Sequence, residues 1–144
     1  MRRTMRSAKE ALQGAGLRRT LPRVAVFSYL ENARRPLSIK ELQKRFPRID
    51  LVTLYRTLAT FKNAGIAKEI HLYGGIRYEI IDPADDHHHI VCTSCRRIED
   101  FADDSHSRLA ERVVRKSRSF ARLTDHSFEL YGLCNTCVKD AALV

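Results

Sequence analysis

The sequence predicts an α+β protein with a helical N-terminal part that ends in a β-hairpin, and a smaller C-terminal part of mixed helix and strand. Apolar residues recur at helical spacing between capping residues over positions 7–65. A Gly74-Gly75 pair then separates two β-rich runs, and two C-x-x-C pairs follow. In a chain of 144 residues both parts are small, so the fold of each would be stabilised by a cross-link such as a metal site, or by a partner.

Three helices are expected before position 50, each with a recognisable start. The first begins at the capping residue Ser7 in "SAKEALQGAG", and the second has Pro22 at an early position of "LPRVAVFSYLEN". The third, "SIKELQKRFP", combines Ser38 as N-cap with Glu41 three residues later, which is a capping box.

A fourth helix is expected in "DLVTLYRTLATFKNAG", from Asp50 to Gly65. Its core-facing residues are predicted to be Leu51, Leu54, Leu58 and Phe61. Its exposed face is predicted to carry Thr53, Tyr55, Arg56 and Thr57. The short gap after the third helix is typical of a helix-turn-helix, so with the hairpin as wing the N-terminal part is predicted to be a winged helix-turn-helix domain. The alternative is a plain three-helix module with a polar outer face.

The charge distribution favours the DNA-binding interpretation. Residues 1–80 contain 17 basic and 6 acidic side chains, a net charge of +11, whereas residues 81–144 contain 9 and 11, a net charge of −2. A basic half of this kind has a polyanion as its natural partner, and we expect double-stranded DNA.

The expected location is cytoplasmic. No apolar run approaches the ~20 residues that span a bilayer, and the basic N-terminus lacks the apolar stretch of a secretory signal. We therefore expect no membrane partner.

The C-terminal part is predicted to be a small α/β dimerisation domain. We expect a DNA-binding domain at 1–81, a hinge at 82–84 and a metal-binding dimerisation domain at 85–144. Strands are expected in "HHIVC" and "HSFELYGLC", and between them a helix with Leu109 and Val113 turned inward. Because such a unit has edge strands, pairing across a two-fold axis would protect them, and a homodimer is expected.

Four cysteines form two C-x-x-C pairs separated by 38 residues: Cys92, Cys95, Cys134 and Cys137. Thiols in the cytoplasm stay reduced, so disulfides are not expected. Two such pairs supply the four soft ligands of a tetrahedral zinc site made of cysteines alone, and we predict a structural Zn²⁺ there. A redox-active pair is the competing interpretation, although one C-x-x-C is sufficient for that chemistry.

Histidines and carboxylates precede the first cysteine pair in "DHHH". In an extended strand alternate side chains point to opposite faces, so His87 and His89 face one side while Asp86 and His88 face the other. Two metal sites can thus lie on the two faces of one strand.

The sequence resembles the ferric uptake regulator superfamily over about residues 12 to 138. The segments that carry the resemblance are "LRRTLPRVAVFSYL", "LVTLYRTLATFKNAGI", "HHHIVCTSCRRIEDF" and "HSFELYGLCNTC". It implies a dimeric, metal-activated repressor with an N-terminal winged helix and a C-terminal metal-binding domain. It also implies that Tyr55 and Arg56 contact DNA, the former against a thymine, and that Arg18 reaches the minor groove.

The resemblance further assigns two candidate metal sites. His87 and His89 match the regulatory hinge site, and the residues implied or available to complete it are Asp100, Glu79, Glu69 and His71. Many members have a histidine where this chain has Pro36, so either the ligand from the first domain comes from the hairpin or the site has one ligand fewer.

Asp86 and His88 match a second site that His126 completes. The family's helix glutamate there falls at Ser107, which leaves His106 or Glu111 as substitutes. Instead of being a ligand, His126 could be a buried strand histidine. His71 could likewise be a surface residue that binds no metal.

The expected function is therefore a metal-responsive transcriptional repressor that binds operator DNA as a metal-loaded homodimer, and not an enzyme. Mixed nitrogen and oxygen ligands suit Fe²⁺, Mn²⁺, Zn²⁺ or Ni²⁺ as the regulatory metal, and iron or manganese is favoured slightly over zinc. A peroxide-sensing repressor that uses bound iron is the alternative. A zinc-dependent hydrolase using His87, His89 and a carboxylate is the alternative from another class, but it leaves the basic half unexplained.

Overall fold

The computed structural model describes residues 7–72, 74–82, 87–124 and 126–142. The chain divides into two compact units, Met1–Pro83 and Ala84–Val144, which are described separately. Asp86 and residues 83–84 of the predicted hinge lie outside the described residues. In the described part of the chain, no helix is both long and apolar enough to cross a membrane.

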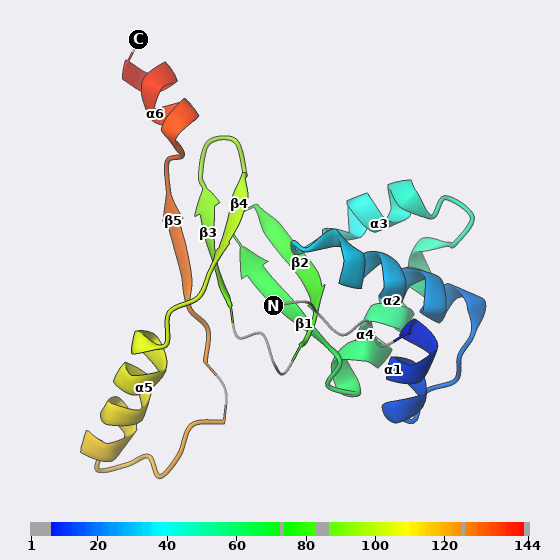
Figure 1. Cartoon of the computed structure of the whole chain (residues 1–144), viewed down its shortest axis with the longest axis horizontal. Coiled ribbons are helices and arrows are strands. Elements are labelled where there is room, and N and C mark those ends of the chain that lie inside the picture. The colour runs from blue at the N-terminus through cyan, green and yellow to red at the C-terminus, as the bar shows by residue number, and fades with distance from the viewer. Residues whose placement is uncertain (1–6, 73, 83–86, 125, 143–144) are drawn as a thin grey trace. The chain divides into compact units, whose positions relative to one another are not determined.

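The N-terminal unit contains four helices and a hairpin (Figure 1). Their bounds are α1 Ala8–Gly14, α2 Leu21–Ala33, α3 Ile39–Arg45, α4 Leu51–Asn63, β1 Ala67–Leu72 and β2 Gly75–Ile80. The predicted caps are confirmed: Ser7 and Ser38 each form a capping box, and the Asp50 side chain accepts from the backbone N–H of Thr53. The antiparallel pairing of β1 with β2 confirms the hairpin around Gly74-Gly75.

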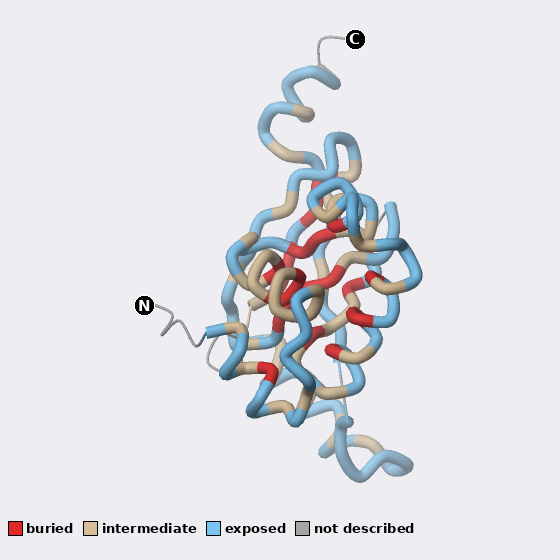
Figure 2. The backbone as a smooth tube through the Cα atoms, turned by 90° about the vertical axis from the view of Figure 1, so that its right-hand side faces the viewer, coloured by how far each residue is buried: buried red, intermediate tan, exposed pale blue. Residues whose placement is uncertain are grey.

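One apolar core holds the helices and the hairpin together. It consists of Leu12, Val26, Phe27, Leu30, Leu37, Leu42, Leu54, Leu58, Phe61, Ala67, Tyr78 and Ile80. At its centre the rings of Phe27 and Phe61 meet edge to face, with centroids 5.8 Å apart. Figure 2 shows the buried stretches in red, running through helices and strands of the chain.

Two predictions for α4 are wrong. Leu51, predicted to face the core, is 40% exposed, because it lies in the first turn, ahead of the packed part of the helix. Thr57, predicted to be exposed, is buried. The inward stripe runs through 54, 57, 58 and 61, which is the i, i+3, i+4, i+7 pattern of one helix face, so position 57 belongs to it.

The hairpin is attached to the helices at two places. Leu37, just before α3, pairs with Tyr78 of β2 through reciprocal backbone hydrogen bonds of 2.9 and 2.8 Å. The Glu41 carboxylate accepts from the Ser38 N–H at 2.8 Å and lies 3.0 Å from the guanidinium of Arg77 in β2 and 2.8 Å from that of Arg35. The residue that caps α3 therefore also binds the wing.

The C-terminal unit is a three-stranded sheet with two helices (Figure 1). Its elements are β3 His88–Cys92, β4 Ile98–Phe101, α5 Ser105–Lys116, β5 Glu129–Gly132 and α6 Asn135–Ala142. The strand order is β4-β3-β5, with β4 antiparallel and β5 parallel to the central β3. The strands β3 and β5 and the helix α5 confirm the predicted elements, whereas β4 and α6 were not predicted.

The prediction that Leu109 and Val113 of α5 turn inward is wrong for the single chain, where they are 54% and 60% exposed. No residue of α5 is buried, although the helix is strongly amphipathic. In Figure 1, α5 and α6 lie at opposite ends of the sheet, and α5 does not lie flat across its face.

Candidate metal centres and nucleic-acid interface

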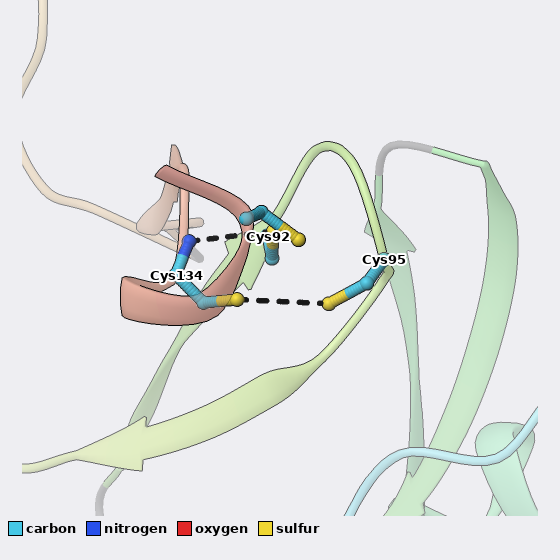
Figure 3. Close-up of side chains that lie close together, drawn as sticks. Cys92, Cys95 and Cys134 are labelled. Carbon is cyan, nitrogen blue, oxygen red and sulfur yellow. Dashed lines mark hydrogen bonds between the residues drawn. The ribbon is translucent and has the colours of Figure 1, made fainter. Parts of the chain in front are cut away.

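The four cysteines converge at one end of the C-terminal sheet. Cys92 ends β3, Cys95 lies in the β3–β4 turn, and Cys134 and Cys137 lie just before and within α6. Their sulfur atoms all lie within 4.8 Å of one another. Figure 3 shows the labelled sulfurs of Cys92, Cys95 and Cys134 grouped between the turn and the start of α6, with Cys95 and Cys134 3.8 Å apart. This arrangement can provide the tetrahedral thiolate shell of a metal ion.

The protonation of the thiols is uneven. Hydrogen bonds from the backbone N–H groups of Cys95 and Cys134 lower the pKa of Cys92 to about 6, and the N–H of Cys137 lowers the pKa of Cys134. A hydrogen bond with Ser94 favours the thiolate of Cys137, but the adjacent Cys134 sulfur, burial and the other two thiols together raise its pKa to about 12. The thiolate form is therefore favoured at Cys92 and Cys134 relative to an ordinary thiol, and a metal would release the remaining protons as it binds.

At the start of β3, His87 and His89 lie close together, and Asp100 lies beside His89. The rings of His87 and His89 meet edge to face with centroids 5.2 Å apart. His89 lies directly across the β3–β4 ladder from Asp100, with Nε2 3.6 Å from Oδ1. These side chains offer nitrogen and oxygen donors, and their role as ligands of a regulatory metal stays a prediction.

The hairpin candidates divide between two faces. Residues directly opposite each other in an antiparallel pair share a face, so Glu79 lies with its partner Lys68, and their side chains are 3.3 Å apart. Glu69 lies on the other face beside His71, 3.6 Å away, and also pairs with Lys62 at 3.0 Å. A single ion can therefore take hairpin ligands from only one of these two groups.

On the opposite face of the central strand, His88 meets His106 and His126. One nitrogen of each ring lies within 4.8 Å of the others. His106 comes from the first turn of α5 and His126 from the segment that precedes β5. Glu111, the other predicted substitute, does not belong to this cluster.

The exposed face of α4 carries two of the predicted DNA-contacting residues, Tyr55 and Arg56. Tyr55 is 47% exposed and Arg56 is exposed beside it. The hydroxyl of Thr53 donates to the Asp50 carboxylate at 2.7 Å, so this threonine also supports the helix cap. Arg18 is exposed between α1 and α2. Thr57 is buried, which leaves it no surface for a DNA contact.

Comparison with known proteins identifies the family. The sequence model of a protein family described as "Ferric uptake regulator family" matches residues 14–131 of the chain. The chain is 32% identical to the ferric uptake regulation protein of Legionella pneumophila, covering 89% of this chain and 96% of the relative. It is also 32% identical to the peroxide operon regulator of Bacillus subtilis, with 94% of each covered.

The fold agrees with these matches. The crystal structure of the Vibrio cholerae ferric uptake regulator is similar with a TM-score of 0.71 and 34% identity, covering 88% of this chain and 98% of the other. The chain belongs to the ferric uptake regulator family, whose members are metal-dependent transcription regulators and not enzymes.

Proposed function

We propose that the chain is a metal-responsive repressor that binds operator DNA as a homodimer through α4 and senses iron(II) or manganese(II) through His87, His89 and Asp100. The observation that carries the proposal is the exposed stripe of α4, the second helix of a helix-turn-helix in the half of the chain with a net charge of +11. Tyr55 and Arg56 of this stripe can reach base edges and phosphates.

The donor set supports the proposed metals. Two imidazoles with a carboxylate suit iron and manganese, since carboxylate oxygen is the ligand that manganese prefers and imidazole suits iron. The relative in Legionella pneumophila is named for ferric uptake regulation.

Glu79 is the hairpin ligand that we favour. It is 6% exposed, and the family resemblance matches it to a ligand position, whereas Glu69 and His71 lie on the other hairpin face. A metal that binds both Glu79 and the His87–His89 pair would fix the angle between the two units. Since metal shifts this equilibrium only through its higher affinity for one arrangement, the fixed arrangement must be the one whose recognition helices match the operator half-sites.

A second copy of the chain would cover the apolar surface of the C-terminal unit. Leu109, Val113, Phe128 and Leu130 are all 38% exposed or more, and β5 is an edge strand of its sheet. Exposed apolar side chains beside an open strand edge are typical of a dimer interface. We further propose that the four thiolates hold a structural zinc ion that stabilises this unit.

The decisive test of DNA recognition is Arg56→Ala, with Arg118→Ala as an exposed arginine control in the C-terminal unit. We expect Arg56→Ala to lower operator affinity by more than about tenfold while the zinc content is unchanged, because a base or phosphate contact is lost. Gel shift and fluorescence anisotropy measure the affinity, and unchanged binding by Arg56→Ala would refute the assignment of α4.

The test of sensing is operator binding titrated separately with iron(II), manganese(II), zinc(II) and nickel(II), with bound metal counted. Iron or manganese should raise operator affinity, and His89→Ala should remove this response. Glu79→Gln should weaken the response and Glu69→Gln should leave it intact. Operator affinity that ignores all four metals would contradict the sensing proposal.

Asp100, 3.6 Å from His89, and the similarity to a peroxide operon regulator favour a second candidate, peroxide sensing through bound iron. This variant predicts that peroxide adds oxygen to His87 or His89 in the iron-loaded protein only. Peptide mass spectrometry that finds both histidines unmodified after such treatment would exclude it.

A further inference from the structure

The wing hairpin contains a carboxylate that is buried although it carries a charge. Glu79 lies in β2, and its side chain is 7% exposed. A carboxylate in such a place is stable only when its charge is compensated by a cation or by hydrogen-bond donors. Lys68 of β1 supplies a cation, because its Nζ lies 3.3 Å from Oε1 of Glu79. The two residues are direct partners in the antiparallel ladder of β1 and β2, so the hairpin itself brings them together (Figure 1).

The Lys68 side chain is able to leave this carboxylate. It is 43% exposed, so its ammonium group has water on one side and the buried carboxylate of Glu79 on the other. Lysine has a flexible four-carbon stem and a strongly hydrated head group, so it can turn into solvent without a change in the backbone of β1. Its ammonium group has donors only, and it can therefore bind Glu79 but cannot itself be a ligand of a metal ion.

A divalent metal and the Lys68 ammonium group compete for one carboxylate. This step rests on the proposed function, in which Glu79 is the hairpin ligand of the sensing metal. Two cations repel each other at short range, and most strongly where the protein excludes water. A metal bound at Glu79 therefore weakens the ion pair with Lys68. By linkage, the ion pair weakens metal binding by the same factor.

We propose that Lys68 is an internal competitor of the sensing metal, which binds Glu79 before the metal does and is displaced by it. The lysine thereby raises the metal concentration at which the regulator responds. It also stabilises the hairpin when metal is scarce, because the charge of Glu79 is compensated in both states. Lys68 acts through Glu79 and is a tuning residue, not a ligand.

The other role open to Lys68 has the opposite sign. Ligating carboxylates are commonly oriented by a hydrogen-bond partner in the outer shell, and a lysine that stayed beside the metal would be such a partner. Removal of an orienting partner weakens metal binding, whereas removal of a competitor strengthens it. The direction of the change in metal affinity therefore decides between the two roles.

The chain offers a matched control on the other face of the same hairpin. Lys62 of α4 lies 3.0 Å from the carboxylate of Glu69 in β1, and its side chain is 51% exposed. Lys68→Met and Lys62→Met each remove one positive charge and one ion pair of the hairpin, but only the first acts on Glu79. A difference between the two variants therefore reports on Glu79 and not on the net charge of the chain.

The test measures manganese(II) binding to the full-length protein supplied with zinc for its four thiols, with free manganese read from its electron paramagnetic resonance signal. We expect Lys68→Met to lower the Kd for manganese by at least about fivefold, the lower end of typical coupling between two sites. Lys62→Met should stay within about twofold of wild type. In a Glu79→Gln background, Lys68→Met should change the Kd by no more than about twofold, because the group through which it acts is gone.

A second readout needs no sensing metal. Without manganese, the amides of β1 and β2 should exchange faster in Lys68→Met than in wild type, because the buried charge of Glu79 has lost its cation. Added manganese should remove this difference, since the ion then compensates the same carboxylate. Exchange in Lys68→Met that equals wild type without manganese would contradict the assigned role.

Manganese binding by Lys68→Met that is unchanged or weaker would overturn the proposal. An equal gain in Lys62→Met, or a gain that persists in the Glu79→Gln background, would do so as well. If Glu79→Gln weakens manganese binding while Lys68→Met has no effect, the inference on Lys68 fails and the proposed ligand stands. If Glu79→Gln binds manganese as wild type does, the hairpin ligand of the proposed function fails together with the inference.

Discussion

The carboxylate of Glu41 contacts the first turn of α3, Arg35 and Arg77 of the hairpin. The substitution Glu41→Gln tests what these contacts contribute to stability. The glutamine keeps the side-chain length and an oxygen that can accept from the Ser38 N–H, so the cap of α3 survives. The negative charge that binds Arg35 and Arg77 is lost. The variant therefore removes the attachment between α3 and the wing without removing the helix cap.

The expected cost follows from the exposure of the two pairs. The Arg35 side chain is 48% exposed, so its pair with Glu41 contributes about 0.2–1 kcal/mol. The Arg77 side chain is 24% exposed, and its charge-assisted hydrogen bond, reduced by solvent screening, contributes about 1 kcal/mol. The free energy of unfolding of the N-terminal unit should fall by about 1–2 kcal/mol, and each kcal/mol lowers Tm by about 4–8 °C in a unit of this size.

The effect depends on pH in a defined direction. Burial raises the pKa of Glu41, but the Ser38 N–H and the two arginines outweigh it and hold the pKa below its ordinary value of 4.5. A carboxylate with a depressed pKa stabilises the fold above its unfolded value and loses that contribution as pH falls through the folded value. The difference between wild type and Glu41→Gln should therefore be constant near neutral pH and shrink below pH 4.5.

Denaturant unfolding of the full chain, with hydrogen exchange to resolve the N-terminal unit, measures this difference. Glu10→Gln is the control, because Glu10 completes the capping box of α1 without an arginine ion pair among the described residues. A loss in Glu41→Gln no larger than in Glu10→Gln would refute the reasoning. A difference that persists undiminished well below pH 4.5 would do so as well.

Two further predictions concern the core and the thiols. Leu58→Ala should destabilise the N-terminal unit by about 2–5 kcal/mol, because the side chain is 1% exposed. Leu51→Ala in the same helix, at 40% exposure, should cost no more than about 0.5 kcal/mol, and equal unfolding midpoints would contradict the observed packing of α4. Cys134→Ser should remove one zinc ion per chain and the protection of C-terminal amides from hydrogen exchange, while α1–α4 keep theirs. Full zinc content in this variant would mean that the four thiols do not share one ion.

Local sequence signals predicted much of this molecule. The serine and aspartate caps, the Gly74-Gly75 turn and the alternation of the three histidines are each set within a few neighbouring residues, and the structure agrees with them. β4 was not predicted, because the charged sequence "IEDF" has no strong strand signal of its own and is held as a strand by its pairing with β3. Thr57 was wrongly predicted to be exposed, because the face of α4 that packs on the core depends on where along the helix the packing begins. The choice of His106 over Glu111 required the tertiary position of α5, which no local spacing encodes.

The turn between β3 and β4 sets the register on which both histidine clusters depend. The Cys92 N–H donates to the Arg97 carbonyl at 2.8 Å, and the Cys92 carbonyl accepts from the Arg96 N–H at 3.0 Å, so the first cysteine pair closes this turn. Because strand side chains alternate, a slip of one residue would exchange His88 and His89 between the faces. A metal bound by Cys92 and Cys95 would thus fix the register of β3 against β4. Deleting a single residue between His89 and Cys92 would keep all the histidines in the chain and yet exchange the strand faces on which His88 and His89 lie.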